Sequence, residues 1–378
     1  MRILLVGEYS RLHNSLKEGL ISLGHEVNII GSGDGFKSFP IDFKVEAPTS
    51  KGLKKKFRSL IYKLFKKDIV SLAVKKQFYS FEEELKNYDV VQLINESSFN
   101  TTPKVEMEFI EFLKQHNKKL FLLSCGTDYI SVAHAYNKKF RYSILTPLFE
   151  NKVTTKDCDP ALKYLSKPYF KLHKTIYEKS NGVIASDLDY HIPLEHHEDY
   201  LGLIPNPINI NNLAFKPLDI NGRIVIFHGI NSSNYYKKGS DIFEEALEVI
   251  QKKYPEETEI ITVKSLPYQE YIKQYDKAHI VLDQVYSYDQ GYNALEAMAK
   301  GKVVLTGAET EFIDFYGLEQ PVAVNVLPEV TDVVEKLETL ILNPESLIQI
   351  GKNARNFIEK EHHYKQIAKK YLEVWHNN

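Results

Sequence analysis

The segment from Tyr288 to Leu305 carries the residue types and spacing best suited to chemistry. Within it, Ala294 to Lys300 is a run of helix-favouring residues, and Gly301 is expected to end that helix. A helix that begins near Gly291 exposes free backbone amides at a point where no side chain blocks a ligand. The segment therefore predicts an anion site at the amino-terminal end of a helix.

Glu296 would lie one to two turns into this helix, on the face that Tyr292 and Asn293 share. Its carboxylate could accept hydrogen bonds from a pair of sugar hydroxyls. Alternatively, Glu296 forms an i,i+4 ion pair with Lys300 on a solvated face. The pattern alone leaves both interpretations open.

Two sets of short, continuous apolar runs predict the strands that hold these residues in place. The first set comprises Ile3 to Val6, Val27 to Ile30, Val90 to Ile94, Leu120 to Leu123 and Val183 to Ala185. The second set comprises Ile224 to Phe227, Ile260 to Val263, His279 to Leu282, Val303 to Thr306 and Val322 to Val326. Helical patterns separate the runs, so each set predicts a doubly wound parallel sheet in an α/β protein.

The stretch Ile204-Pro205-Asn206-Pro207-Ile208-Asn209-Ile210-Asn211-Asn212 separates the two sets, and its prolines and asparagines suit an interdomain hinge. We therefore expect an amino-terminal domain over residues 1–205 and a carboxyl-terminal domain over residues 206–360. Residues 361–378 are expected to form a final helix that can return to the amino-terminal domain. Ligands of doubly wound sheets bind beyond the carboxyl ends of the strands, so the loops that follow these strands are where we expect the site.

Composition excludes several classes of protein. The chain has 378 residues, of which 43% are hydrophobic, which is enough for two cores. Its formal net charge of -2 provides no overall field for nucleic acid, and no nucleic-acid partner is expected. Cys125 and Cys158 lack the spacing of a zinc site or a disulfide framework, which indicates a reducing, cytoplasmic setting. No apolar stretch approaches the roughly 18 residues that a membrane span requires.

Two local patterns superficially suggest other sites. The glycines of Gly31-Ser32-Gly33-Asp34-Gly35 follow the second predicted strand rather than the first, which does not favour a dinucleotide site. The residues Glu195-His196-His197-Glu198 are adjacent instead of being spaced along one helical face. No bound metal is therefore expected.

Several motifs, in order, resemble the retaining glycosyltransferases of the GT-B fold, a group described as glycosyltransferase family 4-like or group 1. In that family a glycine-rich turn and a glutamate-bearing helix precede Ala-Met-Ala-x-Gly and a buried strand, as in the segment from Tyr288 to Leu305. The other matching motifs are Gly24-His25-Glu26-Val27, Ile204-Pro205-Asn206-Pro207-Ile208-Asn209, Lys238-Gly239-Ser240-Asp241 and Thr306-Gly307-Ala308-Glu309-Thr310-Glu311. The resemblance covers nearly the whole chain and implies two Rossmann-like domains that face an interdomain cleft.

The resemblance also implies roles for individual residues on the donor side. The family's matching lysine holds the donor diphosphate, which implies a catalytic role for Lys238 in neutralising the leaving group. The family's second signature glutamate matches Glu296, which would hold the ribose hydroxyls. The other implied donor-binding residues are Gly229, Leu266, Tyr268, Gly291, Tyr292, Asn293 and Glu311. Tyr268 could equally serve as loop packing. The nucleoside-diphosphate sugar is a substrate, and no cofactor is implied.

The chain departs from the family pattern at two positions. Tyr288 stands where the family has its first signature glutamate, and Asp289 is the only carboxylate beside it. The arginine that follows the first strand of the second domain is absent, since Ile230 and Asn231 follow Gly229. We expect Asp289 to cap the following helix instead of replacing the glutamate.

On the amino-terminal domain, Asp128 falls where the family often offers a polar residue to the transferred sugar. A cap on the next helix is an equally supported alternative. The residues Gly7, Glu8 and Tyr9 resemble the family's acceptor-side loop without its tandem glycines. The basic amphipathic stretch from Lys51 to Lys76 predicts a surface helix on the first domain, a contact with an anionic membrane, or both.

The resemblance implies a hexosyltransferase-like enzyme that retains anomeric configuration. It would move a sugar from a nucleoside-diphosphate donor to a glycan or lipid-linked acceptor in surface polysaccharide synthesis. Its expected location is the cytoplasm, with peripheral contact at the inner face of the membrane. A noncatalytic glycan- or nucleotide-sugar-binding protein and a nucleotide-sugar epimerase on the same fold are the alternatives.

Overall fold

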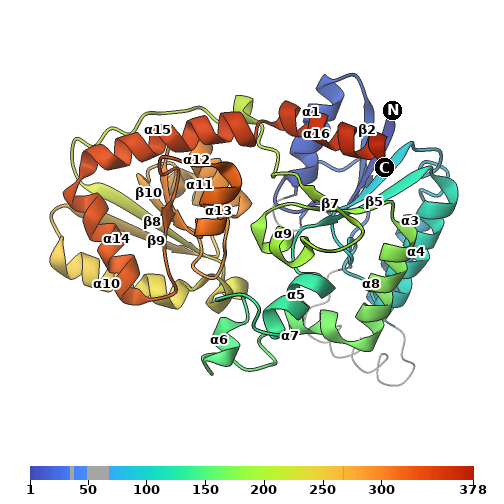
Figure 1. The fold of residues 1–378 in the computed structure, drawn as a ribbon, viewed down its shortest axis with the longest axis horizontal. Helices are drawn as coiled ribbons and strands as arrows, with labels where there is room; N and C mark the ends of the chain where they lie inside the picture. The colour runs from blue at the N-terminus through green and yellow to red at the C-terminus, as the bar shows by residue number, and fades with distance from the viewer. Residues whose placement is uncertain (35–37, 49–67, 267) are drawn as a thin grey trace.

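Two parallel β-sheets lie next to each other in the computed structural model, which describes residues 1–34, 38–48, 68–266 and 268–378 (Figure 1). Most of the basic stretch from Lys51 to Lys76 therefore lies outside the described residues, and its amphipathic character stays a prediction. None of the described helices is both long and apolar enough to cross a membrane.

The amino-terminal sheet has the strand order β3-β2-β1-β4-β5-β6-β7, with every neighbouring pair parallel. Its strands are β1 (Arg2–Val6), β2 (Glu26–Gly31), β3 (Phe43–Lys44), β4 (Val90–Leu93), β5 (Lys119–Ser124), β6 (Val183–Ala185) and β7 (Tyr200–Leu203). Its helices are α1 (Leu12–Ser22), α3 (Ile69–Tyr79), α4 (Pro103–His116), α5 (Tyr129–Tyr136), α6 (Thr146–Phe149), α7 (Asp159–Leu162), α8 (Lys167–Lys179) and α9 (Leu188–Leu194). Separate apolar clusters fill the two faces of the sheet, as fully buried strands require.

The carboxyl-terminal sheet has the order β12-β11-β10-β8-β9 and is also parallel throughout. Its strands are β8 (Ile224–Ile230), β9 (Thr258–Lys264), β10 (Ile280–Leu282), β11 (Val303–Thr306) and β12 (Val324–Asn325). Its helices are α10 (Ser240–Lys253), α11 (Tyr268–Tyr275), α12 (Tyr292–Ala299), α13 (Thr310–Tyr316), α14 (Val330–Leu342) and α15 (Pro344–Glu361). One large apolar cluster holds this sheet and its helices together.

The predicted pair of doubly wound parallel sheets is confirmed, because each apolar run identified in the sequence overlaps a strand. The ends shift, most clearly at β8, which continues three residues beyond Phe227. The strands that were not predicted, β3 and β7, are the two edges of the amino-terminal sheet. An edge strand needs no continuous apolar run, and β7 is only partly buried along its length.

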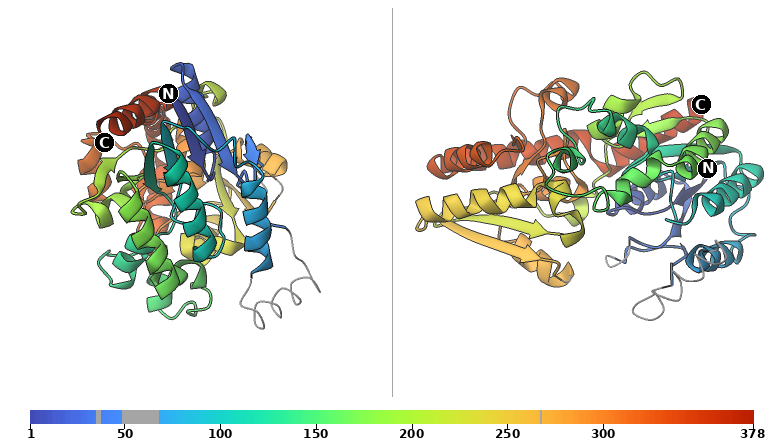
Figure 2. Two further views of the ribbon diagram at one scale, coloured as in Figure 1. Left: turned by 90° about the vertical axis from the view of Figure 1, so that its right-hand side faces the viewer. Right: turned by 90° about the horizontal axis from the view of Figure 1, so that it is seen from below.

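The last helix, α16 (Tyr364–Asn377), lies on the amino-terminal domain beside α1 (Figure 1). Contact with α1 is close, since a Cβ atom on Gly19 would lie 2.5 Å from the carbonyl oxygen of Tyr364. At its far end the buried Trp375 donates a hydrogen bond from Nε1 to Gln92 Oε1 at 3.0 Å. Helices α15 and α16 thus run across both domains, as the view from below also shows (Figure 2).

Candidate active site in the interdomain cleft

A cavity of about 210 Å³ lies between the two domains. Loops that follow β5, β6, β8 and β10 form its walls, so the carboxyl ends of both sheets face it. This is where doubly wound sheets bind ligands. Its lining includes Thr127, Asp187 and Asp189 from the amino-terminal domain and Lys237, Lys238 and Gly291 from the carboxyl-terminal domain.

Asp283 brings two of the predicted site residues together. It follows β10 directly, and its Oδ1 lies 2.7 Å from Nζ of Lys238. Its Oδ2 accepts hydrogen bonds from the amide of Gly291 at 3.2 Å and the hydroxyl of Thr306 at 3.3 Å. The carboxylate is almost completely buried, with 1% of the side chain exposed, so it fixes the lysine at the entrance to α12. Asp283 was not predicted from the sequence, although a carboxylate directly after a buried strand could have indicated it.

The backbone around Lys238 needs glycine. Gly239 has a φ of 72°, and a Cβ atom there would lie 2.3 Å from Cγ2 of Val285. Such a conformation and such a close approach are both accessible to glycine without strain. The backbone conformation at Gly239 therefore helps to position Lys238, as does the ion pair with Asp283.

Lys237 brings a second positive charge to the same cavity. In the part of the chain that the structure describes, it makes no ion pair, whereas the charge of Lys238 is balanced by Asp283. Of the two lysines in this lining, Lys237 is thus the one without a carboxylate partner among the described residues.

Helix α12 begins as predicted, with Gly291 at its amino-terminal cap. The Gly291 amide is bonded to Asp283, whereas no side chain among the described residues bonds to the amides of Tyr292 and Asn293. Tyr292 was predicted to bind the donor, but the structure engages its side chain elsewhere. Its hydroxyl lies 2.7 Å from the hydroxyl of Ser15 on α1 and donates to the carbonyl of Pro207 at 2.9 Å. This tyrosine therefore joins α12 to the amino-terminal domain and to the hinge, because its polar atom is already engaged there.

Glu296 lies on α12 with its side chain partly buried. Burial is the main cause that raises the pKa of Tyr275 and of Tyr292, and the charge of Glu296 is the next largest cause. The carboxylate of Glu296 therefore lies near both tyrosine rings. The i,i+4 partner considered for it, Lys300, has its ion pair with Asp276 at 2.6 Å. Lys300 therefore pairs with Asp276 instead of forming the i,i+4 ion pair with Glu296.

Gly229 and Asn293 lie on either side of Tyr271. A Cβ atom on Gly229 would be 2.7 Å from Cε2 of Tyr271, and Asn293 donates from Nδ2 to the hydroxyl of Tyr271 at 3.2 Å. Leu266 is partly buried against the carboxyl-terminal core. Tyr268 begins α11, and its side chain lies outside the described residues.

Tyr288, which stands where the family has its first signature glutamate, forms a contact between the domains. The backbone amide of Arg141 donates to the Tyr288 hydroxyl at 2.9 Å, and the Arg141 guanidinium lies 4.7 Å from the centre of the Tyr288 ring. The same guanidinium pairs with Glu311 at 2.5 Å and with Glu309 at 3.0 Å. Glu311 was predicted to bind the donor, but its carboxylate holds Arg141 of the other domain. A guanidinium has several N–H donors in a geometry that suits carboxylates, so Arg141 can pair with both glutamates.

Asp289 does not cap α12, contrary to the expectation from sequence. Its carboxylate accepts hydrogen bonds from the amide of Leu188 at 3.3 Å, at the start of α9, and from the amide of Gln290 at 2.7 Å. Burial is the main cause that raises the pKa of Asp289 to about 7, and the nearby Asp189 adds to it. Asp289 is thus a second polar contact between the domains.

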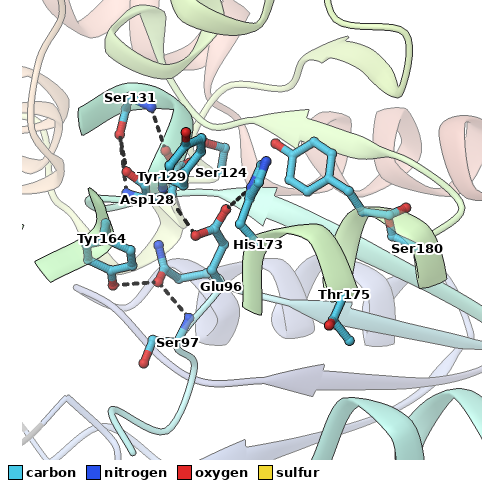
Figure 3. A network of polar contacts seen from close by, with 12 residues as sticks. Glu96, Ser97, Ser124, Asp128, Tyr129, Ser131, Tyr164, His173, Thr175 and Ser180 are labelled. Atoms are coloured by element: carbon cyan, nitrogen blue, oxygen red, sulfur yellow. Dashed lines mark hydrogen bonds and ion pairs between the residues drawn. The ribbon is translucent and has the colours of Figure 1, made fainter. Parts of the chain in front are cut away.

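Asp128 has a capping geometry. Its carboxylate accepts a hydrogen bond from the amide of Ser131 at 2.8 Å, and its own amide donates to the Ser131 hydroxyl at 3.2 Å, which together form a capping box on α5. The hydroxyl of Ser124 also donates to the Asp128 carboxylate. Close by, Glu96 lies 2.7 Å from Nδ1 of His173 and accepts from the amide of Tyr129, as Figure 3 shows. The oxygen atoms of Asp128 are therefore engaged within its own domain.

The loop after β1 contains a carboxyl group with one free oxygen. Glu8 accepts hydrogen bonds at Oε2 from the amide and side chain of Asn14, at 2.9 and 2.6 Å. Its Oε1 is buried and has no partner among the described residues, and burial raises the pKa of Glu8 to about 7. Gly7 has a φ of 87°, and Tyr9 lies next to Gly126. The loop after β1, which was predicted to lie on the acceptor side, thus adjoins the loop that carries Asp128.

No cluster of three or more His, Cys, Asp or Glu side chains in the described ranges is arranged to hold a metal ion. The histidines of the Glu195 to Glu198 segment belong to the region after α9, and His197 lies 3.7 Å from Asp199. Several polar groups near the cleft, such as Arg141 and Asp289, form hydrogen bonds or ion pairs with residues of the other domain.

Comparisons with known proteins agree with this geometry. Residues 229–373, which contain Lys238, Asp283, Gly291 and Glu296, match the model of a family described as glycosyl transferase-like. A search of curated proteins found no match. Among solved structures, sucrose-phosphate synthase from Thermosynechococcus elongatus superposes over the whole of this chain and 98% of its own, with a TM-score of 0.64 and 15% identity.

The chain has the GT-B fold. HepE of Anabaena, solved in complex with UDP-glucose, covers all of both chains with a TM-score of 0.60 and 15% identity. UDP-GlcNAc 2-epimerase from Neisseria meningitidis, bound to UDP-GlcNAc, also covers all of both chains, with a TM-score of 0.53 and 14% identity. At such low identities the similarity to solved structures establishes the GT-B fold alone.

Proposed function

We propose that this GT-B protein is a retaining glycosyltransferase that moves a sugar from a nucleoside-diphosphate donor to an acceptor. One observation carries the proposal, namely that Asp283 fixes Lys238 beside the open amide end of α12, in the cleft between the domains. A cation and free amides at a helix start are the groups that bind a diphosphate. The match of residues 229–373 to glycosyl transferase-like proteins supports the same conclusion.

In this proposal the donor diphosphate lies between Lys238 and Gly291, and Glu296 accepts hydrogen bonds from the ribose hydroxyls. The acceptor hydroxyl oxygen bonds to the anomeric carbon on the face that the diphosphate leaves. The bond from that carbon to the phosphate oxygen breaks, and the acceptor proton passes to the departing diphosphate. The side chains position the reactants and stabilise the growing charge, which is the larger part of catalysis in such a transfer.

The acceptor in this proposal is a glycan or a lipid-linked glycan of surface polysaccharide synthesis. The lysines between positions 51 and 76 support a location at an anionic membrane surface, because each basic residue near such a surface contributes about 1 kcal/mol of attraction. The cytoplasmic face is the corresponding compartment. Binding of neutral and anionic vesicles, measured by sedimentation, tests this part separately.

The direct test is release of nucleoside diphosphate that depends on an added acceptor. We expect acceptor-dependent release from one nucleotide-sugar, with a product whose anomeric proton keeps the configuration of the donor in NMR spectra. An inverted product would contradict the retaining mechanism. Release that is equal with and without any acceptor would contradict the transfer itself.

An epimerase is the second candidate, because nucleotide-sugar epimerases share this fold. It would convert one nucleotide-sugar into another without an acceptor, which the same NMR experiment detects. A noncatalytic binding protein is the third, favoured by the engagement of Tyr288 with Arg141 in place of a sugar-binding glutamate. It would bind the nucleotide-sugar and release nothing.

A further inference from the structure

A second and larger cavity, of about 670 Å³, adjoins the cavity that contains Lys238 and Gly291. The two share the border residues Thr127, Ile144, Asn234 and Lys237. Its volume lies within the range of roughly 300 to 1,000 Å³ that small-molecule sites occupy. The larger cavity therefore has room for a separate ligand that reaches the smaller one at Lys237.

The two domains contribute different chemistry to this cavity. The segment around α6 and α7, which lies below the junction of the domains in Figure 1, supplies an apolar wall. That wall includes Ile144, Leu145, Pro147, Val153 and Ala161. The opposite wall comes from the loop after β8 and the end of β9, and it is polar and basic.

Three lysines line the larger cavity against one carboxylate. Lys152 pairs with Glu150 at 3.1 Å, but Lys237 and Lys264 make no ion pair within the ranges that the structure describes. Lys264 lies 5.8 Å from the centre of the Tyr235 ring. The carboxylate, Asp157, accepts hydrogen bonds from the amide and hydroxyl of Thr154 at 2.9 and 2.7 Å. The lining thus has an excess of positive charge.

The groups that would hold a donor diphosphate face the smaller cavity alone. Lys238 and Gly291 line that cavity and do not line the larger one. The larger cavity therefore lies on the acceptor side of the border, if the donor occupies the site proposed above. Lys237 is the only cation that lines both cavities among the described residues.

We propose that the larger cavity binds the acceptor, and that this acceptor carries an anionic group, a phosphate or a carboxylate, beside an apolar part. The anion lies between Lys264 and Lys237, and the apolar part lies against Leu145 and Val153. Cations that lack a partner bind such a group with charge-assisted hydrogen bonds, while a neutral glycan would leave them unpaired. This assignment rests on the proposed transferase function, and it adds the chemical class of the acceptor.

Binding of three probes to the full chain tests the assignment. Octyl phosphate carries an anion and an apolar chain, glucose 6-phosphate carries an anion alone, and octyl glucoside carries the chain without charge. Calorimetric titrations are made with and without uridine, guanosine or adenosine diphosphate. We expect octyl phosphate to bind more tightly than glucose 6-phosphate, which lacks the apolar part, and octyl glucoside to bind at least about tenfold more weakly than octyl phosphate. The two phosphate probes distinguish a lipid phosphate from a phosphorylated sugar as the source of the anion.

The variant Lys264→Gln should weaken binding of the phosphate probe about tenfold and leave nucleoside diphosphate affinity within about twofold. Lys252→Gln is the matched control, because Lys252 is an exposed lysine in the last turn of α10 and lines neither cavity. It should bind every probe like the parent. A melting temperature close to that of the parent shows that each variant is folded.

Three results would overturn the assignment. The first is equal binding of octyl glucoside and octyl phosphate, and the second is absence of binding by either phosphate probe. The third is loss of nucleoside diphosphate affinity in Lys264→Gln with unchanged probe binding, which would make the larger cavity the donor site. If the parent binds the phosphate probe but no nucleoside diphosphate, the proposed transferase function fails while the anion site stands.

Discussion

Asp283 and Lys238 show how one buried carboxylate organises the candidate donor site. The carboxylate receives the lysine, the Gly291 amide and the Thr306 hydroxyl, so three separate strands or loops depend on one side chain. A buried ion pair adds little net stability but fixes geometry, since each partner becomes costly when the other is removed. Lys238 is thus positioned at the start of α12 before any ligand arrives.

A pH-dependent effect on stability is expected at Asp289. Burial raises its pKa to about 7, from a value near 4 in the unfolded chain. A raised pKa means that the folded state holds the proton more tightly, so this stabilisation is complete below about pH 4 and is lost as pH rises through 7. In Asp289→Asn, the melting temperature should therefore fall less between pH 5 and pH 8 than it does in the parent.

The same substitution at an exposed aspartate, Asp314→Asn on α13, is the control and should run parallel to the parent. Thermal unfolding at four pH values measures all three proteins. Parallel curves for Asp289→Asn and the parent would show that Asp289 does not retain a proton in the folded state. Donor affinity should change less than stability, because Asp289 contacts α9 rather than the open end of α12.

Helix α16 ties the end of the chain to the amino-terminal sheet. Trp375 is completely buried, lies 5.3 Å from the ring centre of Tyr371, and donates to Gln92 in the core of β4. Lys119 adds a hydrogen bond from Nζ to the Trp375 carbonyl at 2.8 Å. The helix is therefore part of the amino-terminal core, although it follows the carboxyl-terminal domain in sequence.

Trp375→Ala should lower the free energy of unfolding by about 3–5 kcal/mol, because it opens a cavity and leaves Gln92 without its partner. The control His376→Ala removes an exposed side chain on the same helix and should change it by less than about 0.5 kcal/mol. Urea unfolding followed by circular dichroism measures both. A cost below about 1 kcal/mol for Trp375→Ala would mean that α16 is not docked in solution.

The elements of the fold were largely predictable because buried parallel strands leave continuous apolar runs such as Val183 to Ala185. Local signals also placed Gly291 and Gly301 at the two ends of α12. The partners of the site residues were not predictable. Arg141 and Glu311 are 170 positions apart, and no local pattern indicates that they meet. Asp128 illustrates the remaining difficulty, since a capping aspartate and a catalytic aspartate look alike in sequence.

At the scale of the whole molecule, a small group of side chains joins the two domains. Arg141 binds Glu309 and Glu311, and Glu309 also accepts hydrogen bonds from Tyr142 and from Asn325. Domains that enclose a nucleotide site commonly move by hinge closure. These contacts stabilise the arrangement in which the strand ends of the two sheets face each other.

Arg141→Ala should weaken the junction between the domains without unfolding either one. Hydrogen exchange of the segment around positions 140–142 and 288 should become about tenfold faster, which corresponds to about 1.4 kcal/mol of opening free energy. Lys139→Ala removes an exposed charge from the same loop and serves as the control. Unchanged exchange at these positions would show that the ion pairs do not hold the domains together.

The proposed donor site lies on the carboxyl-terminal domain, where a nucleoside diphosphate would bind between Lys238, Gly291 and Glu296. Calorimetric titration of Glu296→Gln with the nucleoside diphosphate that binds the parent tests it most directly, beside the exposed control Glu335→Gln on α14. We predict about tenfold weaker binding by Glu296→Gln at an unchanged melting temperature, and parental affinity for the control, because a charged acceptor for the ribose hydroxyls is lost. Binding by Glu296→Gln with the affinity of the parent would mean that Glu296 does not hold the ribose and that the donor site lies elsewhere.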